Sequence, residues 1–369
     1  MASPFRRQIG QLLIGSIPGT TITPEMRSLA REFQLGGVTL FKRNIEAPEQ
    51  VAELNHDLQS LSSELPLWIA VDQEGGRVAR LHAPFTEWPP MATLGRSGDE
   101  KLAYRFAAAL AVELKAVGVT LDYAPVLDIL TNPQNPVIGD RALGEDAATV
   151  ARLGAAVVRG LQENGVAACG KHFPGHGDTS VDSHLALPVV EHPPDRIRRV
   201  ECVPFQEAIR ADVAFMMTAH ILVPALDEQK PATLSSTIVN GMLRNELGFG
   251  GVILSDDLEM KAIADTYTVP EAAVQAIAAG CDGVLICRHL SSERARDAEV
   301  QAAVLEALVH AVEDGRIPYK RAEDALSRNR RAKERFLAAP VAPGRSAALR
   351  EVLGNDTHRR IADEMARFL

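Results

Sequence analysis

The chain has 369 residues, of which 46% are hydrophobic, and its formal net charge is −9 at pH 7. This length and composition predict a globular protein with one large domain or two ordinary ones. The net acidity argues against a nucleic-acid partner, because binding to a phosphate backbone requires a clustered excess of Lys and Arg. We therefore expect a small or neutral ligand.

The N-terminal twenty residues combine a basic start with apolar residues, as a secretory leader does. Gln8 and Gln11 interrupt the apolar run, however, and Pro18 follows soon after. No other segment reaches the roughly 18 consecutive apolar residues that a membrane span requires. We therefore expect a cytoplasmic protein with no membrane partner.

Eight short apolar runs recur along the chain, and helical periodicity fills most of the intervals between them. The runs cover residues 11–17, 36–41, 67–72, 119–128, 165–171, 213–220, 251–257 and 282–288. Strands that are apolar on consecutive residues are typical of a parallel sheet buried on both faces. Eight such strands separated by helices predict an α/β fold of the (β/α)8 TIM-barrel type. The rival doubly wound sheet is disfavoured, since no GxGxxG turn follows the first strand.

The C-terminal part contains two further helical patterns, over residues 319–338 and 346–369, and no further strands. We expect a barrel domain over residues 1–338 and a helical extension over residues 339–369 that packs on it. The charge run at residues 327–335 is interpreted as the solvent-exposed face of a helix.

The four cysteines, Cys169, Cys202, Cys281 and Cys287, show no CxxC spacing, and three of them lie in apolar runs. This pattern predicts buried free thiols rather than disulfides or zinc ligands.

Several apolar runs end in a polar or charged residue, which is where a barrel places its active site. These residues are Lys42, Arg43, Asp72, Asp128, Lys171, His220, Asp256 and Arg288. The alternative for each one alone is a strand end held by an ion pair.

The stretch KHFPGHGDTSVDSH, residues 171–184, is the richest in proton-handling groups. A metal site could draw on His172, His176, Asp178, Asp182 and His184. Helical zinc motifs need two histidines on one helix, however, and Pro174 and Gly175 break any helix here. Barrel metal sites also usually collect ligands from several strand ends. An acid/base loop without a metal is therefore favoured.

Asp182 and His184 lie two residues apart in this stretch, so they can share one side of an extended loop. The carboxylate would then orient the imidazole and favour its charged form, and such a pair can transfer a proton near neutral pH. A solvated or structurally bonded His184 is the alternative. For His176 we expect a bracing role within the loop.

The run at 251–257 ends on Ser255, Asp256 and Asp257. At least one carboxylate should face the barrel mouth as a nucleophile or charge stabiliser. Strand alternation sends the two aspartates to opposite sides, and the residues alone leave open which one faces inward. For the other aspartate we expect a helix N-cap.

Residues 71–81 place Asp72, Glu74, Arg77 and Arg80 around a Gly-Gly turn. A carboxylate can accept paired hydrogen bonds from adjacent sugar hydroxyls, and an arginine can fork onto a hydroxyl or carboxylate. Arg141 is a similar candidate in a later loop, and Lys171 and His172 are candidates at the end of their strand. An internal ion pair is the alternative for each.

These stretches, together with APVLDI at 124–129, resemble the family 3 glycoside hydrolases, and more closely their β-N-acetylglucosaminidases of the NagZ type, which recycle cell-wall fragments. The resemblance extends from about residue 8 to about residue 338. It implies that Asp256 is the nucleophile and that Asp182 and His184 form the acid/base pair. It also implies that N-acetylglucosamine is bound by Asp72, Arg80, Arg141, Lys171 and His172.

The implied reaction is exo-acting and retaining, through a covalent glycosyl-aspartate, and needs no cofactor. The resemblance implies muropeptides with 1,6-anhydro-N-acetylmuramic acid as substrates. The related β-glucosidases lack the histidine motif and place a carboxylic acid in a further domain, so we expect this barrel to be catalytically complete alone, and monomeric.

Four alternatives stay open. A neutral imidazole would not repel phosphate, so a phosphorylase is one of them. A β-glucosidase, a metal-dependent barrel hydrolase and a non-catalytic sugar-binding protein on the same fold are the others.

Overall fold

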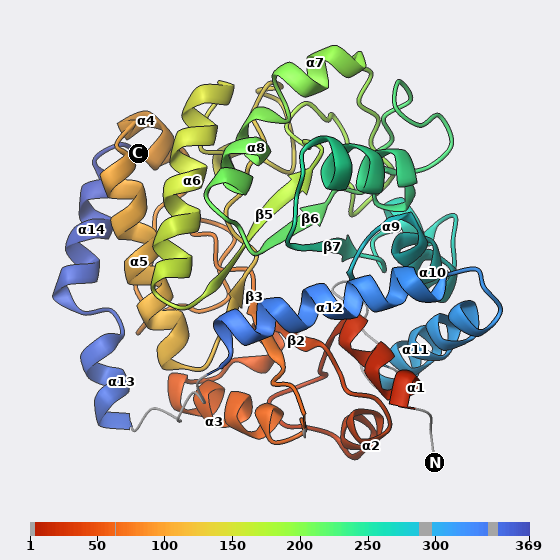
Figure 1. The fold of residues 1–369 in the computed structure, drawn as a ribbon. Helices are drawn as coiled ribbons and strands as arrows, with labels where there is room; N and C mark the ends of the chain where they lie inside the picture. Colours follow the sequence, from red (N-terminus) through yellow and green to blue (C-terminus); the bar gives the residue numbers. More distant parts are fainter. Residues whose placement is uncertain (1–3, 63, 288–296, 339–345) are drawn as a thin grey trace.

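The computed structural model describes residues 4–62, 64–287, 297–338 and 346–369. Its centre is a closed barrel of eight parallel strands that pair in chain order, with β8 returning to β1 (Figure 1). The strands are β1 Leu13–Ser16, β2 Gly37–Leu40, β3 Trp68–Val71, β4 Leu121–Asp122, β5 Ala167–Phe173, β6 Phe215–Thr218, β7 Val252–Asp257 and β8 Gly283–Leu285. Seven strands lie within their predicted runs and β5 extends two residues beyond its run, so the predicted (β/α)8 barrel is confirmed. Arg288, predicted as a strand-end residue, lies outside the described residues.

Helices surround the barrel (Figure 1). Those that precede β5 are α1 Pro4–Ile9 and η1 Gly10–Leu12, which come before β1, then α2 Pro24–Glu32, η2 Lys42–Asn44, α3 Pro48–Gln59, α4 Ala92–Ser97, α5 Glu100–Ala116, η3 Gly139–Arg141 and α6 Ala147–Glu163. Those that follow β5 are α7 Pro194–Arg199, α8 Val203–Arg210, η4 Ala232–Leu234, the π-helical η5 Thr237–Glu246, α9 Lys261–Ala264, α10 Val269–Ala279, α11 Asp297–Glu313, α12 Tyr319–Phe336, α13 Ser346–Val352 and α14 Asp356–Ala366.

Strand β4 is much shorter than the apolar run that predicted it. Pro125 has no N–H to donate, so the regular ladder cannot continue through this position. Pairing resumes beyond it, where Val126 bridges to Lys171 of β5. The chain therefore still follows the barrel wall as far as Asp128.

Helix α12 closes the end of the barrel at which the strands begin. Phe336 packs against Trp68 at 6.3 Å between ring centroids, and Leu337 joins the same interior cluster. Lys333 is only 1% exposed and donates to the Gln11 side chain and to the carbonyl of Gly36. Arg328 pairs with the buried Asp282. The prediction that residues 327–335 are a solvated face is therefore wrong for these two residues, because this helix lies on the barrel.

Residues 346–369 form two helices rather than one. Gly354 adopts a left-handed conformation with φ of 53°, and Asn355 then caps α14 by accepting from the N–H groups of Thr357 and His358. Figure 1 shows α13 and α14 beside α5, on the flank of the barrel. The boundary between barrel and extension stays a prediction.

All four cysteines are buried and free, as predicted. Within the described residues, no helix is both long and apolar enough to cross a membrane.

Candidate active site

A cavity of about 250 Å³ lies at the carboxyl ends of the strands. Ligand sites for drug-sized molecules usually span about 300–1,000 Å³, so this cavity suits a smaller ligand. Every residue predicted to bind or transform the ligand lines it: Asp72, Arg80, Arg141, Lys171, His172, Asp182, His184 and Asp256. Residues more than 180 positions apart in the chain therefore meet at one mouth, as a parallel barrel requires.

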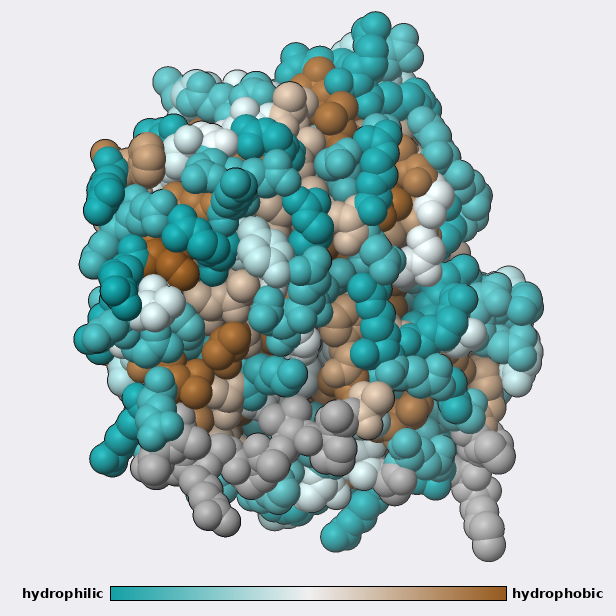
Figure 2. Space-filling view, turned by 60° about the vertical axis from the view of Figure 1, so that its left-hand side comes forward, coloured by the Kyte–Doolittle hydropathy of each residue, from teal (hydrophilic) through white to brown (hydrophobic). Residues whose placement is uncertain are grey.

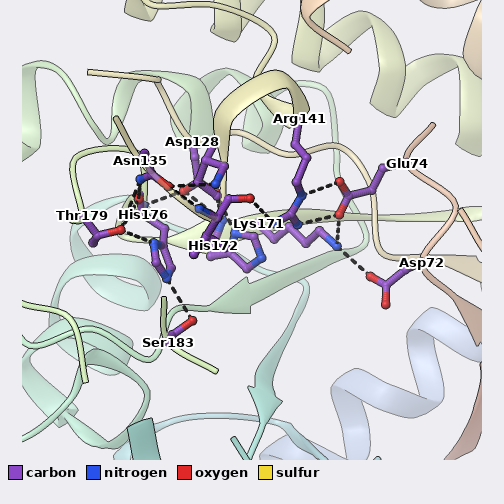
Figure 3. Close-up of polar contacts among 12 residues, drawn as sticks. Asp72, Glu74, Asp128, Asn135, Arg141, Lys171, His172, His176, Thr179 and Ser183 are labelled. Atoms are coloured by element: carbon purple, nitrogen blue, oxygen red, sulfur yellow. Dashed lines mark hydrogen bonds and ion pairs between the residues drawn. The ribbon is translucent and has the colours of Figure 1, made fainter. Parts of the chain in front are cut away.

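One wall of the cavity is a network of ion pairs (Figure 3). Lys171, at the end of β5, donates to Asp72 over 2.8 Å and lies 2.6 Å from Glu74. Arg141 donates to both oxygens of Glu74, at 2.8 and 2.7 Å, and Arg80 donates to Asp72 at 3.2 Å. The internal bridges considered for Arg80 and Arg141 are thus present, and both arginines still line the cavity.

Charge attraction in this network outweighs the cost of burial. Burial alone would raise the pKa of Glu74, but the Arg141 and Lys171 cations lower it to about 2. Burial likewise opposes charge on Lys171, yet Asp72 and Glu74 hold its pKa above the usual value. Asp72, Glu74, Arg141 and Lys171 are therefore ionised at neutral pH, and the network presents fixed donors and acceptors to the cavity.

His172 is oriented by Asp128, which lies beyond β4. The ring Nδ1 lies 2.6 Å from Asp128 Oδ2, and a carboxylate only accepts, so Nδ1 carries a proton. Burial would raise the pKa of Asp128, but the nearby histidines hold it below its usual value. The same carboxylate accepts the backbone N–H of His176, so it fixes both the ring and the start of the loop.

His176 braces the loop, as predicted. Its Nδ1 lies 2.7 Å from the Thr179 hydroxyl and its Nε2 lies 3.1 Å from the Ser183 hydroxyl (Figure 3). Asn135 donates to its backbone carbonyl. Burial lowers the pKa of His176 to about 4, so the ring is neutral at neutral pH.

Asp182 and His184 form the expected pair. His184 Nδ1 donates to Asp182 Oδ1 over 2.8 Å, and the same oxygen accepts the backbone N–H of His184. Burial opposes ionisation of Asp182, but these hydrogen bonds and the ring hold its pKa below the usual value. The side chains are 31% and 36% exposed, so this pair lies at the open side of the cavity.

Asp256 and Asp257 end β7 in different environments. Burial would raise the pKa of Asp256, but His220 and His172 hold it below the usual value. Burial and the nearby Glu259 carboxylate raise the pKa of Asp257 to about 7, although its Oδ1 accepts the backbone N–H groups of Glu259 and Cys287. The expected N-cap is wrong, since Met260 occupies the cap of α9, and Asp257 ties the ends of β7 and β8 instead.

Comparison with known proteins gives one family. The family model for the glycosyl hydrolase family 3 N-terminal domain matches residues 5–332. A beta-hexosaminidase from Nitrosomonas eutropha is 43% identical over 77% of this chain and 82% of its own length. The chain belongs to glycosyl hydrolase family 3. The resemblance seen in the sequence is thereby confirmed.

Other members of family 3 align over different shares of their length. Beta-hexosaminidase A from Pseudoalteromonas piscicida is 36% identical over 94% of this chain, which spans only 60% of that protein. A β-N-acetylglucosaminidase structure from Paenibacillus sp. has a TM-score of 0.93 at 43% identity, covering 100% of this chain and 69% of that one. NagZ from Neisseria gonorrhoeae has a TM-score of 0.80 at 31% identity, covering 97% of each chain.

Some residues of the cavity and of its ion-pair wall could not be predicted from the sequence. The sequence places Glu74 beside the Gly-Gly turn without indicating its partners, and in the structure it pairs with both Lys171 and Arg141. The aromatic and apolar wall is not predicted, because its members lie in runs that look like ordinary core: Phe41, Tyr123, Met217 and Leu285. Of the strand-end candidates, Lys42, Arg43, Asp128 and His220 do not line the cavity.

The metal alternative finds no geometric support in the described part of the chain. There, no group of three or more His, Cys, Asp or Glu side chains is arranged to hold a metal ion. His172, His176 and His184 each hydrogen bond to a different partner: Asp128, Thr179 and Asp182.

Proposed function

We propose that this protein is a retaining exo-β-N-acetylglucosaminidase. One observation carries the proposal: an ionised Asp256 and the Asp182–His184 pair line the same small cavity, beside a wall of fixed hydrogen-bonding groups. These are the two kinds of group that a retaining glycosidase needs, a nucleophile and an acid/base.

In the first step, an Asp256 carboxylate oxygen attacks the anomeric carbon while His184 gives its Nε2 proton to the leaving oxygen. Asp182 accepts from Nδ1, so Nε2 is the nitrogen that exchanges the mobile proton. The products of this step are a glycosyl-aspartate, a neutral imidazole and the free alcohol.

In the second step, the neutral His184 takes a proton from water, and the water oxygen attacks the anomeric carbon and releases Asp256. Because each step inverts the anomeric centre, the overall reaction retains the β configuration.

Asp72, Arg80, Arg141, Lys171 and His172 would bind the sugar hydroxyls. NagZ from Neisseria gonorrhoeae has been solved with N-trifluoroacetyl-D-glucosamine, which supports an N-acylated glucosamine as the ligand here. For the leaving group we propose the anhydromuramic acid of muropeptides released in peptidoglycan recycling, which requires a cytoplasmic enzyme.

The test is release of 4-nitrophenol from the β-N-acetylglucosaminide and, in parallel, from the β-glucoside. We expect turnover of the first substrate only, and a loss of about 10⁴-fold or more in kcat for Asp256→Ala, since no other group forms the covalent intermediate. Equal turnover of both substrates, or a fully active Asp256→Ala variant, would contradict the proposal.

Two additions to the same assay separate the alternative enzymes. Acceleration by inorganic phosphate would favour a phosphorylase. Loss of activity with a chelator, restored by zinc, would favour a metal-dependent hydrolase.

A further inference from the structure

Glu113 is a buried carboxylate outside the cavity that receives four hydrogen bonds from two distant parts of the chain. It lies on α5 and is 1% exposed. Two of the bonds come from Thr86, whose N–H and hydroxyl donate over 2.8 and 2.6 Å. The other two come from the N–H of Gly354 at 2.9 Å and from His358 Nδ1 at 2.7 Å.

Thr86 belongs to the loop between β3 and α4, which also carries Asp72 and Arg80. This loop is folded back on itself. Gln73 accepts the N–H groups of Arg80 and Leu81 through one side-chain oxygen, and the carbonyl of Trp88 accepts the N–H of Gly76. The Gly76–Trp88 bond therefore links the second part of the loop, residues 82–90, to its first part, residues 72–81, several of whose residues line the cavity.

Gly354 and His358 belong to the C-terminal helical unit, residues 346–369. A Cβ atom on Gly354 would lie 2.3 Å from the carbonyl oxygen of Pro84, so the unit touches the loop directly as well as through Glu113. Met365 and Leu349 are buried on its inner side. Its side of the molecule is mostly hydrophilic, with hydrophobic residues in small separate patches (Figure 2).

We propose that the C-terminal unit positions the sugar-binding loop after β3, and that Glu113 is the positioning residue through which it acts. The match to the family 3 domain model ends at residue 332, so this unit lies outside the matched segment. The inference deepens the proposed function and rests on it: the loop being held carries Asp72 and Arg80, which would bind the sugar.

The first variant is Glu113→Gln. An amide keeps the shape but offers one acceptor oxygen in place of two, and its NH2 would face N–H or O–H donors. We expect KM for 4-nitrophenyl β-N-acetylglucosaminide to rise several-fold, with kcat within about twofold, because contacts made equally in the ground and transition states are loosened. Hydrogen exchange of the amides at residues 76–81 should also become faster.

His358→Leu and His358→Asn form a matched pair. Asn can place an N–H donor where His358 Nδ1 lies, so it should keep a KM near the wild-type value, whereas Leu should reproduce the Glu113→Gln increase. Arg105→Ala is the control, because it removes only the exposed ion pair between α5 and Glu364 of α14. We expect it to leave KM unchanged.

The inference would be overturned if Glu113→Gln and His358→Leu both kept the wild-type KM and the wild-type rate of hydrogen exchange at residues 76–81. This holds even if both variants melt at a lower temperature. The exchange measurement needs no turnover. An inactive wild-type enzyme would therefore refute the proposed function, while exchange would still decide whether the C-terminal unit holds the loop.

Discussion

Glu74 is the carboxylate on which two cations of the cavity wall depend. Its side chain is 1% exposed, and its partners Lys171 and Arg141 are nearly as buried. Removing one partner of a buried ion pair is costly, because it leaves the remaining charge without compensation in a medium of low dielectric constant.

We therefore expect Glu74→Gln to lower the free energy of unfolding by about 3 kcal/mol. KM for the glucosaminide should also rise, because Arg141 would lose its carboxylate partner and Lys171 would lose one of its two, Asp72 being the other. Urea unfolding monitored by circular dichroism measures the first effect, and initial rates measure the second.

Glu246→Gln is the control for this variant. Glu246 pairs with Arg198 on the surface, where both side chains are 40% exposed and an ion pair contributes roughly 0–1 kcal/mol. Equal destabilisation by the two substitutions would contradict the role assigned to Glu74.

At the scale of secondary-structure elements, α12 is the helix that closes the far end of the barrel. Among the residues that the structure describes, no carboxylate pairs with Lys333, and its ammonium donates to an amide oxygen and a backbone carbonyl. Burial lowers its pKa from 10.5 to about 7.

This shift makes stability depend on pH. Between about pH 7 and pH 10.5 the unfolded chain keeps the Lys333 proton while the folded chain has lost it, so stability rises with pH through this window. Below pH 7 both states carry the proton, and the folded state bears the full cost of burying the charge.

Lys333→Met should remove this dependence. We expect the free energy of unfolding of the variant to exceed that of the wild type by more at about pH 6 than at about pH 9.5. Urea unfolding of both proteins at the two pH values measures the difference. Parallel pH dependence in the two proteins would show that Lys333 does not titrate in the folded state near neutral pH.

At the scale of the whole molecule, the cavity opens at one end of the barrel, α12 covers the other end, and the C-terminal unit lies on the flank. The barrel could be predicted from the sequence because consecutive apolar residues at eight places have few alternatives to a parallel sheet. Most of the residues that line the mouth could be predicted too, because strand ends in such a barrel converge on one site.

Side-chain partners over long sequence distances could not be predicted. Arg141 and Glu74 are both charged residues in loops, and nothing local tells which carboxylate an arginine will meet. The burial of Lys333 could not be predicted, because a run of charged residues normally marks a solvated helix face. Lys333 is buried because α12 lies on the end of the barrel. His358 and Glu113 meet through helix packing alone.

The central claim, that Asp256 is the nucleophile and His184 the acid/base, is tested most directly by trapping the intermediate. His184→Ala should still react with 4-nitrophenyl β-N-acetylglucosaminide in the first step, because 4-nitrophenolate leaves without a proton. The second step should be slow, because no base activates water.

The measurement is mass spectrometry of this variant quenched during turnover, followed by peptide mapping. The account predicts a burst of 4-nitrophenol and a protein heavier by one N-acetylglucosaminyl unit, attached to the peptide that contains Asp256. A sugar attached to another residue, or steady turnover at the wild-type rate with no attached sugar, would contradict it.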